Sequence, residues 1–374
     1  MKKIDVLMLD LKSYYPSPPY QLGLLAAYAN TEEDVREQIT FTFSEHPRTQ
    51  PEADIARAIL DAGADMVAAS HYAWNQHKLL KVLRLLAASG EDLPWIVLGG
   101  PNASGKIGAE VFEKYPMVSA LVDGEGEPAF RDICLALTDS PTRNPFAEAR
   151  NCVLRGEDGS IVQGDMGHRI QFLDDIPSPY MTGLLPTRPG PIFYETNRGC
   201  PYRCAFCYWG QGNSKIYRMS LERIEEEMTF FAERKVSSFW LADANFGIFP
   251  DDAKIAQLMV EINNRHGNPF SFVGVNWAKN SSDRILEIAG TFRRGGMQTA
   301  TTLALQSVTP EAETASKRYA MPPRPFINLI ASAHRQDIDT YTDLIWGLPG
   351  EGVDEFIRGI DAVVSSGIPS IKIH

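Results

Sequence analysis

The sequence predicts an α/β protein in two parts: a doubly wound parallel sheet of the Rossmann type, followed by a partial (β/α)6 TIM-like barrel. Short apolar segments alternate with helical patterns twice along the chain, as they do where helices join parallel strands. A proline-rich stretch, 139–190, separates the two series. With 374 residues, of which 44% are hydrophobic, the chain is long enough to form two domains.

The N-terminal domain is expected over residues 1–140. Its first strand is the apolar run 4–9, which is too short and too interrupted by Asp5 for a signal peptide. Further strands are predicted at 39–43, 66–70, 95–100 and 118–123, and helices at 20–30, 52–62, 75–89, 106–115 and 127–138. Ligands of such sheets bind beyond the carboxyl ends of the strands, so the candidate loops are 10–20, 70–77, 99–105 and 123–127.

The second series of elements is expected to form a barrel over 191–374, after a linker, 141–190, that carries one hairpin. The hairpin pairs 151–155 with 160–164. Barrel strands are predicted at 192–196, 237–242, 270–276, 299–307, 340–347 and 370–374, with helices at 220–234, 251–265, 282–291, 324–335 and 353–366. The chain stops within the sixth strand, so we expect the natural protein to continue beyond His374.

The overall composition excludes two classes of partner. The chain has 36 Lys and Arg against 47 Asp and Glu, a formal charge of −11. Binding to nucleic acid needs a basic surface, so no nucleic-acid partner is expected. No stretch approaches the ~20 apolar residues of a membrane-spanning helix, so no membrane partner is expected either. We therefore predict a cytoplasmic protein.

Three of the five cysteines are packed into eight residues, as Cys200, Cys204 and Cys207. The odd total and this spacing indicate a metal site in a reducing compartment, not a disulfide framework. A structural zinc site needs a fourth ligand, and none lies nearby in the sequence. Three thiolates can hold three irons of a [4Fe–4S] cluster and leave the fourth iron open for another ligand. Cys134 and Cys152 lie outside the motif and are expected to be structural.

The segment from Arg198 to Cys207, RGCPYRCAFC, resembles the signature of the radical S-adenosylmethionine superfamily. The resemblance implies a [4Fe–4S] cluster that binds S-adenosylmethionine through its open iron. Other segments match at strand ends, where barrel chemistry lies, including ADANF at 242–246 and GLPGE at 347–351. The residues implied to contact S-adenosylmethionine are Phe206, Asp243, Asn245, Asn276, Gln306, Ser307 and Leu348.

The N-terminal domain resembles the cobalamin-binding domain of class B radical S-adenosylmethionine enzymes. It lacks a G-x-G-x-x-G after its first strand, which argues against a dinucleotide, and has glycines that would let the backbone approach a large ring. The residues implied to bind cobalamin are Ser70, Tyr72, Trp74, Gly99, Gly100, Pro101, Gly124, Glu125 and Gly126.

The sequence departs from many cobalamin domains because it has no D-x-H-x-x-G motif, whose histidine ligates the cobalt. We therefore expect Trp74 to block the lower face of the ring. Ligation by His71 is the alternative.

The resemblance spans nearly the whole chain and implies a methyltransferase. One S-adenosylmethionine would methylate cobalamin, and a second would yield a 5′-deoxyadenosyl radical that activates an unreactive carbon for methylation. Rearrangement, ring contraction or cyclisation with the same cofactors is the alternative, followed by a non-catalytic sensor. Methylthiotransferases need a second cysteine trio, and residues 1–133 contain no cysteine. The implied partners are a small-molecule or peptide substrate and an electron donor such as flavodoxin or ferredoxin.

Overall fold

The computed structural model describes residues 3–374 apart from 14–16, 140–145, 147–148, 156–159, 166, 168, 188, 211–214, 280–281 and 320. The chain forms two compact units, Met1–Pro186 and Thr187–His374. Each unit is described by itself.

The first unit contains a seven-stranded sheet in the order β2-β1-β3-β4-β5-β6-β7. Its first five strands are parallel: β1 (Ile4–Leu11), β2 (Ile39–His46), β3 (Met66–Ser70), β4 (Trp95–Gly99) and β5 (Val118–Val122). The chain reverses its direction of winding between β1 and β3. In open α/β sheets a ligand crevice forms beyond the carboxyl ends of the strands at this switch point.

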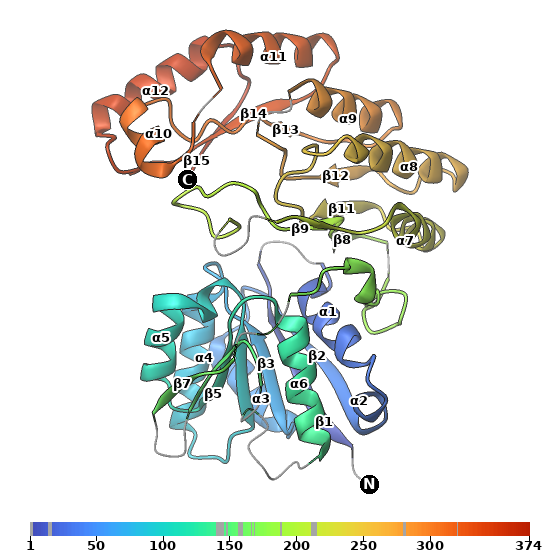
Figure 1. Ribbon diagram of the computed structural model, residues 1–374, viewed down its shortest axis with the longest axis vertical. Coiled ribbons are helices and arrows are strands. Elements are labelled where there is room, and N and C mark those ends of the chain that lie inside the picture. Colours follow the sequence, from blue (N-terminus) through green and yellow to red (C-terminus); the bar gives the residue numbers. More distant parts are fainter. Residues whose placement is uncertain are drawn as a thin grey trace. The chain divides into compact units, whose positions relative to one another are not determined.

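Helices cover both faces of this sheet (Figure 1), because strand β1 is apolar on both sides. Val6 and Met8 pack with α1 (Tyr20–Ala29), α2 (Glu33–Gln38) and α6 (Gly126–Asp139). Leu7 and Leu9 face the other way, toward α3 (Glu52–Ala62), α4 (Gln76–Ala88) and α5 (Gly105–Lys114). Successive strand residues point to opposite faces, so this one run of hydrophobic residues serves two cores.

The hairpin predicted within the linker belongs to the first sheet. Its strands are β6 (Cys152–Arg155) and β7 (Ile161–Gln163), and β6 pairs antiparallel with β5. Cys152 and Leu154 point into the core, which explains why the hairpin docks there. The turn, 156–159, lies outside the described residues. The short helix α2 was not predicted.

The second unit has six parallel strands in chain order. They form two three-stranded sheets, β12-β11-β8 and β13-β14-β15, which are linked by a bridge between Phe272 and Gln298. The strands are β8 (Pro191–Tyr194), β11 (Ser238–Leu241), β12 (Phe272–Gly274), β13 (Thr301–Thr302), β14 (Thr340–Leu344) and β15 (Ile371–Ile373). A separate antiparallel pair joins β9 (Asn197–Arg198) to β10 (Tyr217–Arg218).

The helices of this unit alternate with its strands. They are α7 (Leu221–Glu233), α8 (Asp251–Arg265), α9 (Ser282–Arg294), α10 (Pro310–Ser316), α11 (Pro323–Arg335) and α12 (Val353–Ser365). The successive helices α7, α8 and α9 pack side by side (Figure 1). This is the predicted partial (β/α)6 barrel, with α10 as an addition that was not predicted.

Strand β13 is much shorter than the predicted strand 299–307. The hydroxyl of Thr342 donates to the carbonyl of Leu303 at 2.7 Å, and the N–H of Leu305 donates to the same hydroxyl at 3.4 Å. A side chain thus takes the place of regular ladder bonds. The segment still follows β14, since the N–H of Gln306 donates to the carbonyl of Asp343.

The predicted fold class is confirmed in both units. Among the described residues, no helix has the length and apolarity that crossing a membrane requires.

Candidate functional site

The three clustered cysteines lie in a turn that follows β9. Cys200 and Cys204 are buried and Cys207 is partly exposed, and all three are free thiols. The N–H of Cys207 donates to the carbonyl of Cys204 at 3.0 Å, and the N–H of Ala205 donates to the carbonyl of Ser316 at 2.8 Å. The end of α10 therefore holds the cysteine turn in place.

Gly199 opens this turn with a φ of 118°, a conformation that favours glycine. A Cβ here would lie 2.4 Å from the carbonyl oxygen of Lys215. The chain can therefore enter the cysteine turn only through a residue without a side chain.

Two of the thiols receive a side-chain hydrogen bond. The amide nitrogen Nδ2 of Asn245, beyond β11, donates to Sγ of Cys200 at 3.1 Å. The ammonium group of Lys279, beyond β12, donates to Sγ of Cys204 at 2.7 Å. The same ammonium lies 4.4 Å from the centroid of the Tyr202 ring, a cation–π contact. Strand ends thus bring polar groups to the sulfurs, as expected for a barrel.

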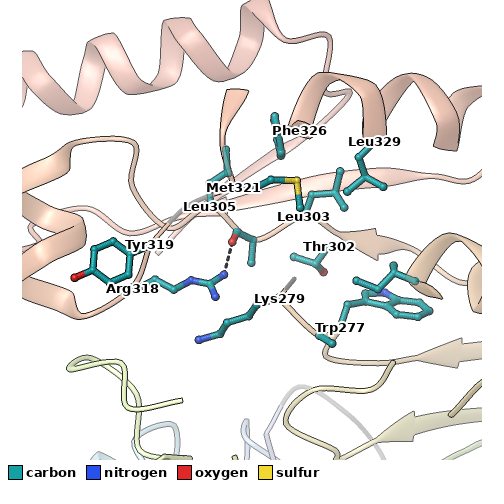
Figure 2. A pocket seen from close by; sticks show the side chains of 13 residues that line it. Trp277, Lys279, Thr302, Leu303, Leu305, Arg318, Tyr319, Met321, Phe326 and Leu329 are labelled. Carbon is teal, nitrogen blue, oxygen red and sulfur yellow. Dashed lines mark hydrogen bonds between the residues drawn. The ribbon is translucent and has the colours of Figure 1, made fainter. Parts of the chain in front are cut away.

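Arg318 adds a second cation and is only 6% exposed. Its guanidinium donates to the carbonyl of Ala304, and its Nε has no hydrogen-bond partner among the described residues. Burial lowers the pKa of Arg318, while the charges of Cys204 and Tyr202 oppose this shift. Arg318 and Lys279 line one pocket, with apolar side chains such as Phe326 and Leu329 (Figure 2).

The donor set fits an iron–sulfur cluster. Within the described residues, no three His, Cys, Asp or Glu side chains converge on one metal ion. A cubane differs from a single ion because its thiolates bind separate irons and stand further apart. Burial raises the pKa of Cys207, and Cys200 and Cys204 lie near enough to raise it further. One short turn therefore holds all three thiols free, as cluster ligation requires.

Asp243 is completely buried and binds the segment that leads into the cysteine turn. Its carboxylate accepts hydrogen bonds from the N–H and hydroxyl groups of Thr196, the former at 2.7 Å. It also accepts them from the N–H and Nδ2 of Asn197, at 3.2 and 2.9 Å. Burial raises the pKa of Asp243 to about 7. These contacts make Asp243 a positioning residue between two strand ends.

The ends of the fourth and fifth barrel strands are joined through Glu351, the last residue of the GLPGE turn. The hydroxyls of Ser307 and Thr309 both donate to its Oε1, at 2.6 and 2.7 Å. Gln306 has a φ of 73° and bridges to Leu344.

The other residues predicted to contact S-adenosylmethionine differ in exposure. Leu348 is buried, Asn276 is exposed, and Phe206 is 41% exposed. The amide of Asn276 donates to the carbonyl of Asp243 at 3.1 Å, so its strand end adjoins that of β11.

The predicted cobalamin loops lie at the carboxyl ends of β3, β4 and β5. After β3, the rings of Tyr72 and Trp74 stack with centroids 4.1 Å apart and planes at 11°. Trp74 is 58% exposed, whereas Ser70 is buried. A large exposed aromatic surface at this position is suited to contact with a flat ligand.

His71 lies between these residues but is fully buried. The backbone N–H of His71 donates to the carbonyl of Gly99, and its backbone carbonyl accepts a hydrogen bond from the N–H of Asn102. Neither imidazole nitrogen has a partner among the described residues. Burial lowers the pKa of His71, which favours the neutral ring.

The remaining cobalamin candidates form the turns after β4 and β5. Gly100 has a φ of 97° and would bring a Cβ within 3.2 Å of the carbonyl oxygen of His71. Pro101 begins a 3-10 turn. Gly124, which precedes Glu125, has a φ of 88°. Glu125 is engaged by the guanidinium of Arg169 and by the N–H of Ile170. Gly126 begins α6.

Three residues of the site were missed from the sequence. Lys279 follows the end of β12 closely, which is a signal that could have indicated it. Glu351 belongs to a turn that was singled out, but its partners were not predictable. Arg318 lies beyond α10, a helix that was itself missed, and carries no local signal.

The chain thus combines a partial barrel, which carries a candidate iron–sulfur site, with a Rossmann-type domain. The model of the Radical SAM superfamily matches residues 194–363. The "Cobalamin-dependent radical SAM methyltransferase TokK" of Streptomyces tokunonensis is 35% identical in an alignment over 367 residues that covers 94% of this chain and 52% of that protein. These matches confirm the predicted resemblance to the cobalamin-dependent radical SAM family.

A second relative and two solved structures agree. The "2-(S-pantetheinyl)-carbapenam-3-carboxylate methyltransferase" of Streptantibioticus cattleyicolor is 35% identical over 94% of this chain and 52% of its own length. TsrM from Kitasatospora setae, with cobalamin and a [4Fe–4S] cluster bound, aligns with a TM-score of 0.74 at 15% identity, over 100% of this chain and 75% of its own. OxsB with aqua-cobalamin and S-adenosylmethionine bound aligns with a TM-score of 0.71 at 17% identity, over 96% and 52%.

The two structures support the fold of each unit. The chain spans about half the length of the two methyltransferases that it matches at 35% identity.

Proposed function

We propose that the chain is part of a methyltransferase that methylates an unactivated carbon of a small-molecule or peptide substrate. The observation that carries the proposal is the match of 94% of the chain to two methyltransferases, together with the free cysteine trio in the barrel. When bound, the [4Fe–4S] cluster supplies the electron that cleaves S-adenosylmethionine to a radical, and cobalamin supplies the methyl group.

In this proposal Cys200, Cys204 and Cys207 hold the cluster. Asn245 and Lys279 donate to two of these sulfurs, and Asp243 fixes the loop that precedes them. Hydrogen bonds of this kind orient metal ligands and adjust their electron density.

In this proposal a further set of residues faces S-adenosylmethionine. It consists of the exposed Phe206, the strand-end residues Asn276, Gln306 and Ser307, and Leu348. Glu351 stabilises this surface because its carboxylate accepts a hydrogen bond from Ser307 and so holds Ser307 to the GLPGE turn.

Cobalamin would lie on the loops after β3, β4 and β5, which include Ser70, Tyr72, Gly99, Gly100, Pro101, Gly124, Glu125 and Gly126. The exposed ring of Trp74, stacked on Tyr72, is the group we assign to the lower face of the cofactor. His71 is the less suitable candidate because its imidazole is buried. The Trp74 ring would offer cobalamin an aromatic surface without a ligand atom.

An external electron donor such as flavodoxin or ferredoxin would reduce the cluster, and both this partner and a cytoplasmic location belong to the proposal.

The proposed methyltransferase activity is tested by anaerobic reconstitution with iron, sulfide and cobalamin, followed by an assay for 5′-deoxyadenosine and S-adenosylhomocysteine. The carbapenam named for the Streptantibioticus relative is a suitable first substrate to try. Both products together with a methylated substrate are expected. A converted substrate of unchanged carbon count would instead indicate a rearrangement.

A further inference from the structure

Two cationic side chains beside the cysteines stand out because neither forms an ion pair with a carboxylate in the described part of the chain. The ammonium of Lys279 contacts Sγ of Cys204 at 2.7 Å and the ring of Tyr202. The guanidinium of Arg318 has one carbonyl acceptor and a buried Nε without a partner.

A buried cation without an anion is unfavourable because it has lost its hydration without electrostatic compensation. Arg318 is therefore expected to face an anion in the working protein. Arg318 shares a pocket with Lys279, which contacts Cys204, and the charges that act on Arg318 include those of all three cluster cysteines. A cluster held by three thiolates is itself anionic, and it becomes more negative when it accepts an electron.

We propose that Lys279 and Arg318 are the charge-compensating residues of the cluster and that they raise its reduction potential. Both cations stabilise the reduced cluster more than the oxidised one, because the reduced form carries the larger negative charge. Net charge and hydrogen bonds to the sulfurs are the established levers on such potentials. The inference rests on the proposed function only in requiring that the cysteine trio holds a cluster.

The chain offers a matched control for the charge. Lys317 lies next to Arg318 in sequence, but it is exposed and has a φ of 53°. Lys317→Asn removes one positive charge from the same loop and keeps a residue that tolerates this backbone conformation. A charge in water is screened, so the cluster potential should not respond.

The experiment is a redox titration of the full reconstituted chain, in which paramagnetic resonance measures the fraction of reduced cluster. S-adenosylmethionine and substrate are omitted, so a contact of Lys279 with the carboxylate of S-adenosylmethionine cannot contribute. Lys279→Met should lower the ratio of reduced to oxidised cluster about tenfold at a fixed potential, a shift of about 59 mV to more negative values. Arg318→Gln should shift the potential in the same direction. Arg318→Lys, which keeps the charge, should restore most of it.

Unchanged potentials in Lys279→Met and Arg318→Gln, at full iron content, would overturn the inference. A shift of equal size in Lys317→Asn would also count against it, because the effect would then not be local. If Arg318→Gln fails to load a cluster, the result for Lys279→Met decides. The titration involves no methyl transfer, so a chain that holds the cluster but methylates nothing refutes the proposed function and leaves this inference standing.

Discussion

The two units use the same edge of a parallel sheet in different ways. At the strand ends of the first unit, the candidate loops offer glycines and an aromatic pair, the half-buried Tyr72 and the exposed Trp74. The nearby His71 is buried, and its imidazole has no partner among the described residues. In the second unit, the strand ends carry thiols, a buried carboxylate and the cation Lys279, and the loop after α10 adds the cation Arg318. The side chains at each edge suit the proposed ligand. A large flat ring needs apolar and aromatic contact surface, whereas an anionic cluster needs positive charges nearby.

The largest expected effect comes from removing a cluster ligand. Cys204→Ala should abolish the brown chromophore and the formation of 5′-deoxyadenosine, because the cluster loses one of its three thiolate ligands. Cobalamin binding should persist, since it belongs to the other unit. Iron content and absorbance spectra measure both. Cys134→Ala is the control, because Cys134 is buried in the core of the first unit. A Cys204→Ala protein that still held four irons would show that Cys204 is not a cluster ligand, and the contrast between the two units would then lose its basis.

The next effect concerns the buried carboxylate of the second unit. Burial raises the pKa of Asp243 from 3.8 to about 7, so between these values the folded state binds more protons than the unfolded state. The free energy of unfolding should therefore fall as pH rises through this range, by at most about 1.4 kcal/mol per pH unit.

Asp243→Asn cannot titrate and should flatten this dependence. Urea denaturation at about pH 5, 6 and 7 measures the slope in both proteins. An identical slope in the variant would show that the pH dependence arises elsewhere.

A smaller effect is expected at the GLPGE turn. Glu351→Ala leaves the hydroxyls of Ser307 and Thr309 without their shared acceptor, at a cost of about 1–3 kcal/mol. S-adenosylmethionine should bind about tenfold more weakly, which corresponds to about 1.4 kcal/mol. Equilibrium binding to the reconstituted chain tests this. Glu355→Ala is the matched control, since Glu355 pairs with Arg358 on an exposed helix face, and it should bind normally.

The smallest effect on stability is expected in the first unit, at Trp74, because the ring is exposed. Trp74→Ala should slow methyl transfer more than cleavage of S-adenosylmethionine, so that 5′-deoxyadenosine forms without methylated product. Trp74→Phe should recover part of the coupling. The paramagnetic resonance spectrum of the cob(II)alamin form reports the coordination. A nitrogen splitting that disappears in His71→Ala would refute the role of Trp74.

The sequence was sufficient for features that depend on local patterns. The alternation of apolar residues located the strands of both units, and the spacing of the cysteines predicted the ligands of a cluster. It was not sufficient for contacts between distant residues. Lys279 and Cys204 are 75 positions apart, and Ser307 and Glu351 are 44 apart, so only the fold brings them together. The shortness of β13 has the same origin, because it depends on a hydroxyl from β14.

The hairpin β6–β7 has a consequence for how the chain is made. Without it, β5 would end the sheet with a row of unpaired backbone groups, which can recruit strands from other molecules. The hairpin covers that row and leaves only the three exposed residues of β7 at the margin. A growing chain on the ribosome cannot complete this cover until Gln163 has emerged. Chaperone dependence and aggregation should therefore concentrate in shortened chains that end between β5 and β7.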